Sequence, residues 1–151
     1  MKITIIIPVY NEQAHIEHML GSLAGQTIKP SQVIIVDDNS TDNTPSIIKK
    51  YVDTYPWITA VNTHRESKHS PGTKVIEAFY KGYEKCDLDA QLIGKFDADI
   101  ILPSNYLEKM AAIFASDNLV GIASGNLYIK KRDVWIFENI SEKTKVRGPI
   151  K

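Results

Sequence analysis

Apolar positions in the first part of the chain follow two different periods. Residues 3–9 form a β-branched run without polar alternation, the pattern of a strand covered on both faces in a parallel sheet. Pro8 is expected to end the hydrogen-bond ladder of this strand, and Asn11 to cap a helix that ends near Gly25. The helical spacing comes from Ile16, Met19, Leu20 and Leu23. A strand, a turn and a helix are therefore predicted in sequence.

A second strand and helix repeat this order. Residues 32–36 form another buried-strand run and lead directly into residues 37–42, a cluster of turn-forming and capping side chains. Thr44 before Pro45 predicts an N-cap followed by the first helical residue. The apolar stripe of this helix consists of Ile48, Tyr51, Val52 and Tyr55.

The middle of the chain continues the alternation. Residues 57–61 predict a weaker third strand, and residues 64–72 form a loop that is too polar to pack. Residues 73–85 have a helical stripe, although Gly82 weakens this helix by about 1 kcal/mol relative to alanine. Residues 92–96 predict the fourth strand.

The last third of the chain has weaker patterns. A fourth helix is expected after Pro103, and residues 119–129 predict a fifth strand. Residues 130–151 have no clear period, and the basic triplet at 130–132 is interpreted as a solvated turn, with contact to an anionic ligand as the alternative. Strands that alternate with helices predict an α/β fold, with a mostly parallel sheet flanked by helices.

The composition is that of a soluble globular protein. The chain has 151 residues and a mass of 17.0 kDa, which suits one domain with a single core. Eighteen Lys and Arg residues balance eighteen Asp and Glu residues, so the electrostatic attraction expected of a nucleic-acid-binding protein is missing. The lone Cys86 excludes an intramolecular disulfide. With no apolar run long enough for a transmembrane segment, we expect a cytoplasmic protein.

Three polar clusters, residues 10–12, 37–40 and 97–99, each follow a predicted strand. Ligands of such sheets bind outside the carboxyl ends of the strands, so the clusters are expected to line one edge. Asp97 and Asp99 offer hard oxygen ligands that can hold a divalent cation, and a bound cation can hold a diphosphate. An isolated acidic pair of this kind is more often a solvated turn. The convergence of three clusters favours a site.

These clusters resemble those of a known family. Ile-Ile-Ile-Pro-Val-Tyr-Asn-Glu at residues 5–12, Val-Ile-Ile-Val-Asp-Asp-Asn-Ser-Thr-Asp at residues 33–42 and Phe-Asp-Ala-Asp at residues 96–99 together resemble the donor-binding half of the inverting family 2 glycosyltransferases. The resemblance implies the GT-A fold, a Rossmann-like nucleotide-diphospho-sugar transferase fold. It also implies a UDP- or GDP-linked sugar donor, Mg2+ or Mn2+ as cofactor, and a carbohydrate or lipid-linked acceptor, as in polysaccharide biosynthesis.

The resemblance assigns roles to single residues around the nucleoside. The turn from Pro8 to Glu12 would border the nucleobase and the ribose, with Tyr10 against the base. The alternative for Tyr10 is a partly buried aromatic at a strand end. Asp38 would hydrogen-bond the base or the ribose because a carboxylate accepts the N–H of a uracil- or guanine-type edge, whereas Asp37 would fix the loop. For Asp38 the alternative is a helix cap.

Further roles concern the diphosphate. By resemblance, Asp97 would contact the ribose or the metal, and Asp99 would ligate the metal. Two features are less specific. Lys74 is interpreted as a phosphate contact or as a solvent-facing lysine, and the loop at residues 64–72 as a donor cover or a loop without a ligand. Many relatives carry an Asn-x-Gly pattern in the third helix that this chain lacks, so no donor contact is assigned there.

Inversion requires a general base, and none is evident in this chain. By resemblance the base lies in the acceptor-binding half, beyond Lys151, and Asp133, Glu138 and Glu142 are interpreted as surface charges. Residues 1–151 are therefore expected to be a single nucleotide-sugar-binding domain, the N-terminal part of a longer enzyme that is cytoplasmic or peripheral at the inner membrane face. The alternative is a nucleotide-sugar-binding fragment without turnover.

Two other classes fit less well. A receiver-like signalling domain is also α/β with clustered acids, but it expects an acidic pair after the first strand, where this chain has Pro-Val-Tyr-Asn. A sugar nucleotidyltransferase should have a glycine-rich, basic loop after that strand, and this chain has none.

Overall fold

The computed structural model describes residues 1–63 and 73–138 of the chain. The chain divides into two compact units, Met1–Leu107 and Glu108–Lys151. Four of the five predicted strands and all of the predicted nucleotide- and metal-binding residues belong to the first unit, which is considered first.

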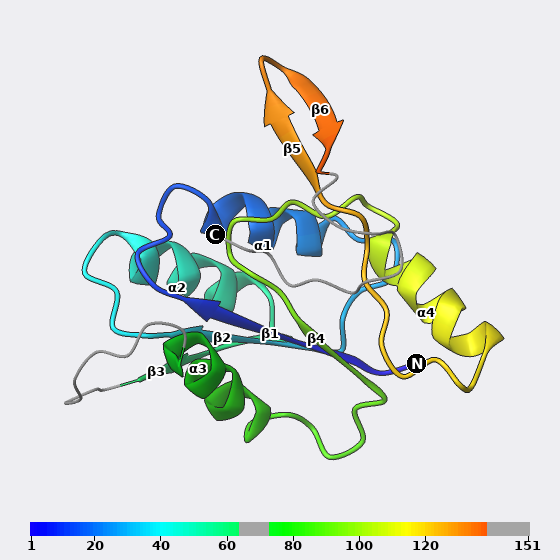
Figure 1. The fold of residues 1–151 in the computed structure, drawn as a ribbon. Helices are drawn as coiled ribbons and strands as arrows, with labels where there is room; N and C mark the ends of the chain where they lie inside the picture. Colours follow the sequence, from blue (N-terminus) through cyan, green and yellow to red (C-terminus); the bar gives the residue numbers. More distant parts are fainter. Residues whose placement is uncertain (64–72, 139–151) are drawn as a thin grey trace. The chain divides into compact units, whose positions relative to one another are not determined.

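A four-stranded parallel sheet forms the centre of the first unit (Figure 1). The strand order is β3-β2-β1-β4, with the bounds β1 (Ile3–Val9), β2 (Gln32–Asp37), β3 (Ile58–Asn62) and β4 (Leu92–Lys95). Parallel neighbours require crossover connections, which the helices supply. The α/β fold with a mostly parallel sheet is thus confirmed, and each predicted strand in this unit agrees with the structure to within one residue at either end.

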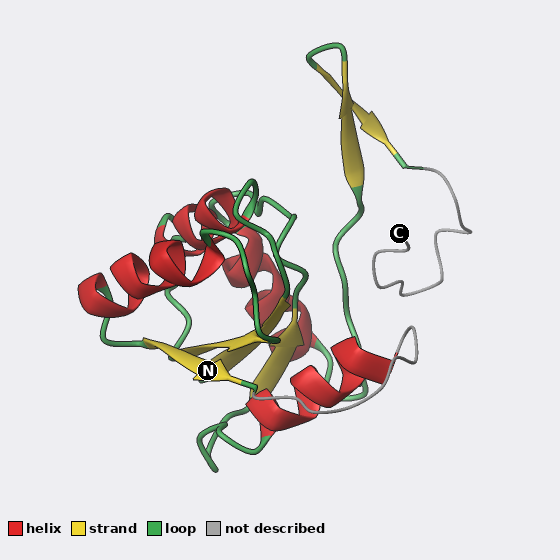
Figure 2. Cartoon of the chain, turned by 90° about the vertical axis from the view of Figure 1, so that its left-hand side faces the viewer, coloured by secondary structure: helices red, strands yellow, loops and turns green. Residues whose placement is uncertain are grey.

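The two central strands are buried on both faces. α1 (Ile16–Ala24) and α2 (Thr44–Thr54) lie on one face of the sheet, and α3 (Thr73–Tyr83) lies on the other (Figures 1 and 2). The apolar stripe predicted for α1 is the one it buries, since Ile16, Met19, Leu20 and Leu23 are all fully buried. Helices on both faces explain why β1 and β2 lack polar alternation.

Both predicted N-caps differ from the structure. α1 begins five residues after Asn11, with His15 in the N-cap position, and the side chain of Asn11 bonds to another loop instead. α2 begins at Thr44, which is one residue earlier than predicted, with Asn43 in the N-cap position. The Thr44 hydroxyl accepts the N–H of Glu12 at 2.9 Å. In each case the side chain that was expected to cap a helix instead forms a hydrogen bond between the two loops.

α3 approaches the sheet closely at Gly82. A Cβ atom added to this glycine would lie 2.5 Å from Cγ2 of Ile6 and 3.0 Å from Cγ2 of Val36, and both side chains are fully buried. The glycine, which from the sequence only weakens the helix, therefore permits the packing of α3 on β1 and β2.

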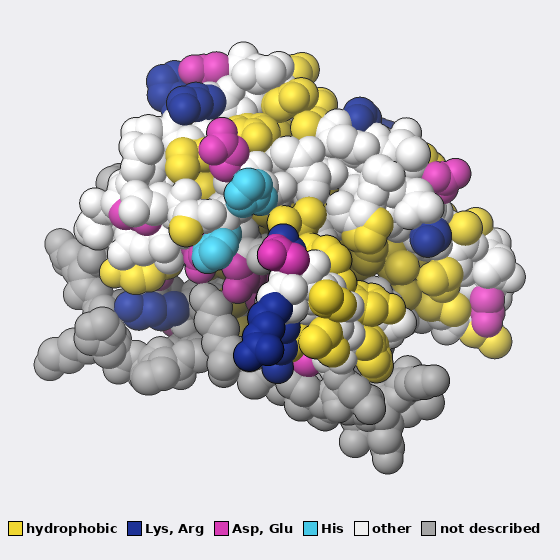
Figure 3. Space-filling view, turned by 90° about the horizontal axis from the view of Figure 1, so that it is seen from above, with side chains coloured by type: hydrophobic (Ala, Val, Ile, Leu, Met, Phe, Trp, Pro, Cys, Tyr) yellow, Lys and Arg dark blue, Asp and Glu magenta, His cyan; other side chains and the backbone are white. Residues whose placement is uncertain are grey.

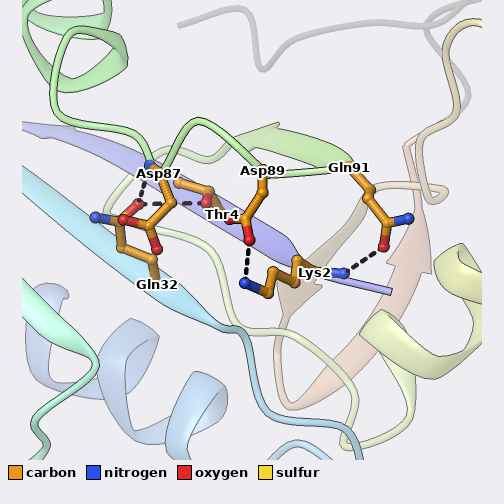
Figure 4. A network of polar contacts seen from close by, with 6 residues as sticks. All are labelled: Lys2, Thr4, Gln32, Asp87, Asp89 and Gln91. Carbon is orange, nitrogen blue, oxygen red and sulfur yellow. Dashed lines mark hydrogen bonds and ion pairs between the residues drawn. The ribbon is translucent and has the colours of Figure 1, made fainter.

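A polar network lies at the amino-terminal ends of β1, β2 and β4 (Figure 4). Lys2 pairs with Asp89 through its ammonium group, and its backbone N–H donates to Oε1 of Gln91 at 2.9 Å. Oε1 of Gln32 accepts the N–H of Asp87 at 3.1 Å and the hydroxyl of Thr4 at 3.3 Å. The connection from α3 to β4 is thereby attached to the starts of β1 and β2, away from the predicted site.

In the second unit, the prediction of a fifth strand at residues 119–129 is wrong. Residues 119–127 contain no strand, and an antiparallel hairpin follows instead, formed by β5 (Tyr128–Lys131) and β6 (Val134–Phe137). Its turn residues Arg132 and Asp133 have φ values of 47° and 64°, as a two-residue type I′ hairpin requires. Glycines at 121 and 125 interrupt the apolar run that suggested the longer strand.

Most of the other features predicted for this unit agree with the structure. The fourth helix is α4 (Tyr106–Ser116), which begins at the end of the first unit. The basic triplet at residues 130–132 is exposed as expected, but it is a turn only in part, because Lys130 and Lys131 end β5 and only Arg132 of the triplet lies in the turn. Asp133 is a surface charge paired with Lys130 at 2.9 Å. Within residues 1–63 and 73–138, no helix is long and apolar enough to cross a membrane.

Candidate functional site

The three polar clusters lie along one edge of the sheet. β1, β2 and β4 are parallel and adjacent, so their carboxyl ends share this edge. The register pairs Val9 with Asp37 and Ile6 with Lys95, and each cluster begins within a few residues of these pairs. The prediction that the clusters line a common edge is confirmed.

Pro8 ends the ladder on one side of β1 only. The N–H of Phe96 donates to the carbonyl of Ile6 at 3.1 Å, and the next donor toward β4 would be the nitrogen of Pro8, which carries no hydrogen. On the other side, the N–H of Asp38 donates to the carbonyl of Val9 at 2.8 Å. The chain after β4 is therefore released from β1 where the third cluster begins.

Hydrogen bonds join the loop after β1, residues 10–13, to residues 38–44, which are the loop after β2 and the first residue of α2. We call these two segments the loop pair. Asn11 has a φ of 54°, a left-handed conformation that Asn tolerates. Its N–H donates to Oγ of Ser40 at 2.9 Å, and its Oδ1 accepts the N–H of Thr41 at 2.8 Å. Three bonds continue the contact: Glu12 N–H to Thr44 Oγ1, Gln13 N–H to Asp42 Oδ2, and Asn43 N–H to Gln13 Oε1.

Two substitutions at Asn11 distinguish the contribution of its side-chain hydrogen bonding to stability from that of its left-handed backbone conformation. Asn11→Gly is expected to lower the free energy of unfolding by about 1 kcal/mol, because it removes the hydrogen bonds that Oδ1 accepts from the N–H and the hydroxyl of Thr41, of which the second is long, and keeps the left-handed φ accessible. Asn11→Ala is expected to cost about 1–2 kcal/mol more, because Cβ disfavours that φ. Chemical denaturation measures both, with exposed Asn118→Ala as the control. An alanine variant as stable as the glycine variant would contradict the assigned conformation.

Asp37 and Asp38 are adjacent but make different contacts. Asp37 is 4% exposed, and its Oδ1 accepts the N–H of Ser40 at 3.0 Å, so it fixes the loop as predicted. Asp38 is half-buried, and its Oδ1 accepts the hydroxyl of Thr63 at 2.6 Å. Thr63 was not predicted from the sequence. Its position directly after the third strand, at the same edge, is the signal that could have identified it.

Asp97 and Asp99 lie in the segment after β4. Asp97 accepts a 2.8 Å ion-pair contact from the ammonium of Lys95, and Asp99 is exposed. In the described part of the chain, no group of three or more His, Cys, Asp or Glu side chains could form a metal cage. Two carboxylates still fit Mg2+ or Mn2+, since Mg2+ usually binds through one or two carboxylates together with substrate phosphates and water.

Side chains from α1 and the following turn hold the chain beyond the acidic pair. Gln26 is 2% exposed, and its amide group donates to the carbonyl of Pro103 at 2.7 Å and accepts the N–H of Leu107 at 3.0 Å. The hydroxyl of Ser22 accepts the N–H of Leu102 at 3.2 Å. The segment that carries the two acids is thus anchored at both ends, by β4 and by these contacts.

The other predicted site residues lie in or near the same edge. Tyr10 is 56% exposed, whereas Pro8 and Glu12 are partly buried. Figure 3 shows that acidic, basic and histidine side chains are all exposed on one face of the molecule. Lys74 is partly buried in the first turn of α3, and the predicted loop at residues 64–72 lies outside the described residues. Contact of these residues with a nucleotide stays a prediction.

Comparison with known proteins identifies relatives. An uncharacterised glycosyltransferase of Mycoplasma pneumoniae is 31% identical over 153 residues, which cover 97% of this chain and 49% of the relative. An uncharacterised glycosyltransferase of Nostoc is 25% identical over 122 residues, covering 81% of this chain and 35% of the relative. The chain therefore spans at most about half the length of these curated relatives.

Solved structures share the fold. The mannosyltransferase PcManGT from Pyrobaculum calidifontis, solved in complex with GDP-Man and Mn2+, is 28% identical with a TM-score of 0.64, covering 80% of this chain and 34% of that chain. Staphylococcus aureus TarS is 27% identical with a TM-score of 0.63, covering 77% and 20%. The fold is the GT-A fold of glycosyltransferases, of which this chain carries a part. Residues 4–149 match the family model described as Glycosyl transferase family 2, and the chain therefore belongs to that family.

Proposed function

We propose that the protein is an inverting glycosyltransferase that transfers a sugar from a metal-bound nucleoside diphosphate sugar to an acceptor hydroxyl. The observation that carries the proposal is the convergence of three polar loops on the edge formed by β1, β2 and β4. Strand order spreads the predicted contacts along this edge, with Asp38 after β2, Tyr10 after β1, and Asp97 and Asp99 after β4. An extended donor can lie across them.

The nucleoside would bind at the loop pair. The carboxylate of Asp38 would accept an N–H of the base or a ribose hydroxyl. The exposed ring of Tyr10 offers an apolar face for the base, and Pro8 and Glu12 would border the bound nucleoside. The hydrogen bonds that join the two loops support this role, because a nucleoside bound there would meet groups whose positions are already fixed.

The diphosphate would bind beyond β4. Asp99, and Asp97 beside it, would hold Mg2+ or Mn2+, which when bound supplies positive charge against the departing nucleoside diphosphate. The ammonium of Lys95 holds one oxygen of Asp97 and so orients this carboxylate. The mannosyltransferase structure with GDP-Man and Mn2+ is consistent with a cation in the family.

Transfer also needs an acceptor site. A general base would deprotonate the acceptor hydroxyl, whose oxygen would attack the anomeric carbon opposite the leaving diphosphate, so that its bond to the diphosphate breaks and the configuration inverts. We infer that residues 1–151 form the nucleotide-sugar-binding domain, and that the base and the site for a carbohydrate or lipid-linked acceptor come from beyond Lys151. The coverage of at most about half of the curated relatives supports this division.

Nucleotide binding tests the proposal directly. In the presence of Mn2+, UDP or GDP is expected to raise the melting temperature, and at about 100 times its Kd the stabilisation is about 2.7 kcal/mol. For a protein of this size, that corresponds to a shift of several degrees. Each nucleotide is compared with uridine or guanosine, which lack the diphosphate. No shift with either nucleoside diphosphate, at concentrations up to several millimolar, would contradict the proposal.

A further inference from the structure

Thr63 occupies a fixed position at the candidate site. It follows β3 directly, and its N–H donates to the carbonyl of Asp37 at 2.9 Å, which extends the contact between β3 and β2 by one residue. The residue is 2% exposed. Its backbone therefore cannot shift without breaking the end of the sheet, and its side chain has a defined direction.

The hydroxyl of Thr63 donates to Oδ1 of Asp38 at 2.6 Å. Hydroxyl-to-carboxylate bonds of this length are charge-assisted and stronger than those between neutral groups. The backbone of Asp38 is held from the other side, because its N–H donates to the carbonyl of Val9 at 2.8 Å. Asp38 is thus fixed by β1 through its main chain and by the end of β3 through its side chain.

We propose that Thr63 is a positioning residue for nucleobase selection, which acts by fixing the carboxylate of Asp38. The inference rests on the proposed function, in which Asp38 meets the base. A carboxylate held by a hydroxyl donor presents acceptor oxygens to the ligand. Uracil and guanine offer a ring N–H to such an acceptor, whereas cytosine and adenine place an acceptor nitrogen at the corresponding ring position and would be repelled. Thr63 therefore contributes to the preference for uracil or guanine.

A structural role and a positioning role differ in what they change. A threonine that only fills space and satisfies its own hydroxyl would, when replaced, alter stability and weaken all nucleotides alike. A threonine that orients Asp38 affects mainly the nucleotides that use the carboxylate as an acceptor. The ratio of affinities between bases therefore distinguishes the two roles, whereas stability alone does not.

The test uses Thr63→Val, which keeps the branched shape and removes the hydroxyl, and Thr63→Ser, which keeps the hydroxyl. Thr4→Val is the matched control, because Thr4 is 1% exposed, donates to Gln32 at 3.3 Å and lies at the opposite end of β1. Calorimetry of the intact protein gives the Kd for UDP, GDP, CDP and ADP at constant Mn2+, and the melting temperature of each variant is recorded.

Thr63→Val is expected to weaken the preferred nucleotide about tenfold, the effect of losing one bond to a charged group, and to change CDP and ADP much less. Thr63→Ser should restore most of the preference, and Thr4→Val should leave all four Kd values unchanged. An unchanged ratio between bases in Thr63→Val, or no rescue by serine, would overturn the role of Thr63. A wild-type protein that binds none of the four would instead overturn the proposed function, and this inference with it.

Discussion

Asp99→Ala is expected to remove most of the Mn2+ dependence of nucleoside diphosphate binding. In the wild-type protein, EDTA should weaken binding, because the diphosphate would lose the cation that holds its oxygens. Asp99 is exposed, and in the described part of the chain no third acidic or histidine side chain is placed to replace it. Loss of a residue that supports a metal ligand typically costs ten- to a hundredfold in affinity, so loss of a ligand itself should cost at least about tenfold.

The measurement is the Kd for UDP and GDP, with Mn2+ and with EDTA, in the wild type and in the variant. Asp53→Ala is the matched control, because Asp53 is an exposed aspartate on α2 that pairs with Lys49 at 2.8 Å. The control should keep the full response to Mn2+, while Asp99→Ala should bind about equally under both conditions. An Asp99→Ala protein that still responds to Mn2+ like the wild type would exclude Asp99 as the principal metal ligand.

The sequence was sufficient to predict the sheet and the edge at which the three polar clusters lie. Strands buried on both faces have an unbroken apolar pattern, as residues 3–9 and 32–36 do, and the polar clusters after them mark the carboxyl ends. Parallel pairing then brings these clusters together, whatever the exact register. In the second unit this reasoning failed, because an apolar run interrupted by glycines is compatible with either strand or loop, and a short hairpin has no such extended pattern.

The contacts within the site depend on tertiary structure. Local rules predicted that Asn11 and Thr44 cap helices, and both side chains instead bond to the neighbouring loop. The contact of Thr63 with Asp38 exists only because β3 is the neighbour of β2, which the sequence does not specify. A motif can therefore identify the residues that carry charge, whereas the residues that position them emerge only once the strand order is known.

Gly82→Ala is expected to destabilise the protein, although alanine is the better helix former. The gain in helix propensity is about 1 kcal/mol. The added Cβ would lie 2.5 Å from Cγ2 of Ile6, closer than Cβ atoms approach other atoms in proteins, and 3.0 Å from Cγ2 of Val36, which is a tight contact. Both neighbours are buried and branched, so they cannot move aside freely. Overpacking of this kind typically costs about 1–3 kcal/mol after the surrounding structure has relaxed. Part of that relaxation would be a movement of α3 away from β1.

Gly21→Ala is the control that isolates this effect. Gly21 lies within α1, and a Cβ there would meet only the hydroxyl of Tyr51 at 3.5 Å, an ordinary van der Waals distance. That variant should raise the free energy of unfolding by about 0.5–1 kcal/mol. Chemical denaturation should therefore give opposite signs for the same substitution in two helices of one protein. A stabilising Gly82→Ala would mean that there is room for the added Cβ beside Cγ2 of Ile6. In that case α3 could not lie as close to β1 as it does in the structure.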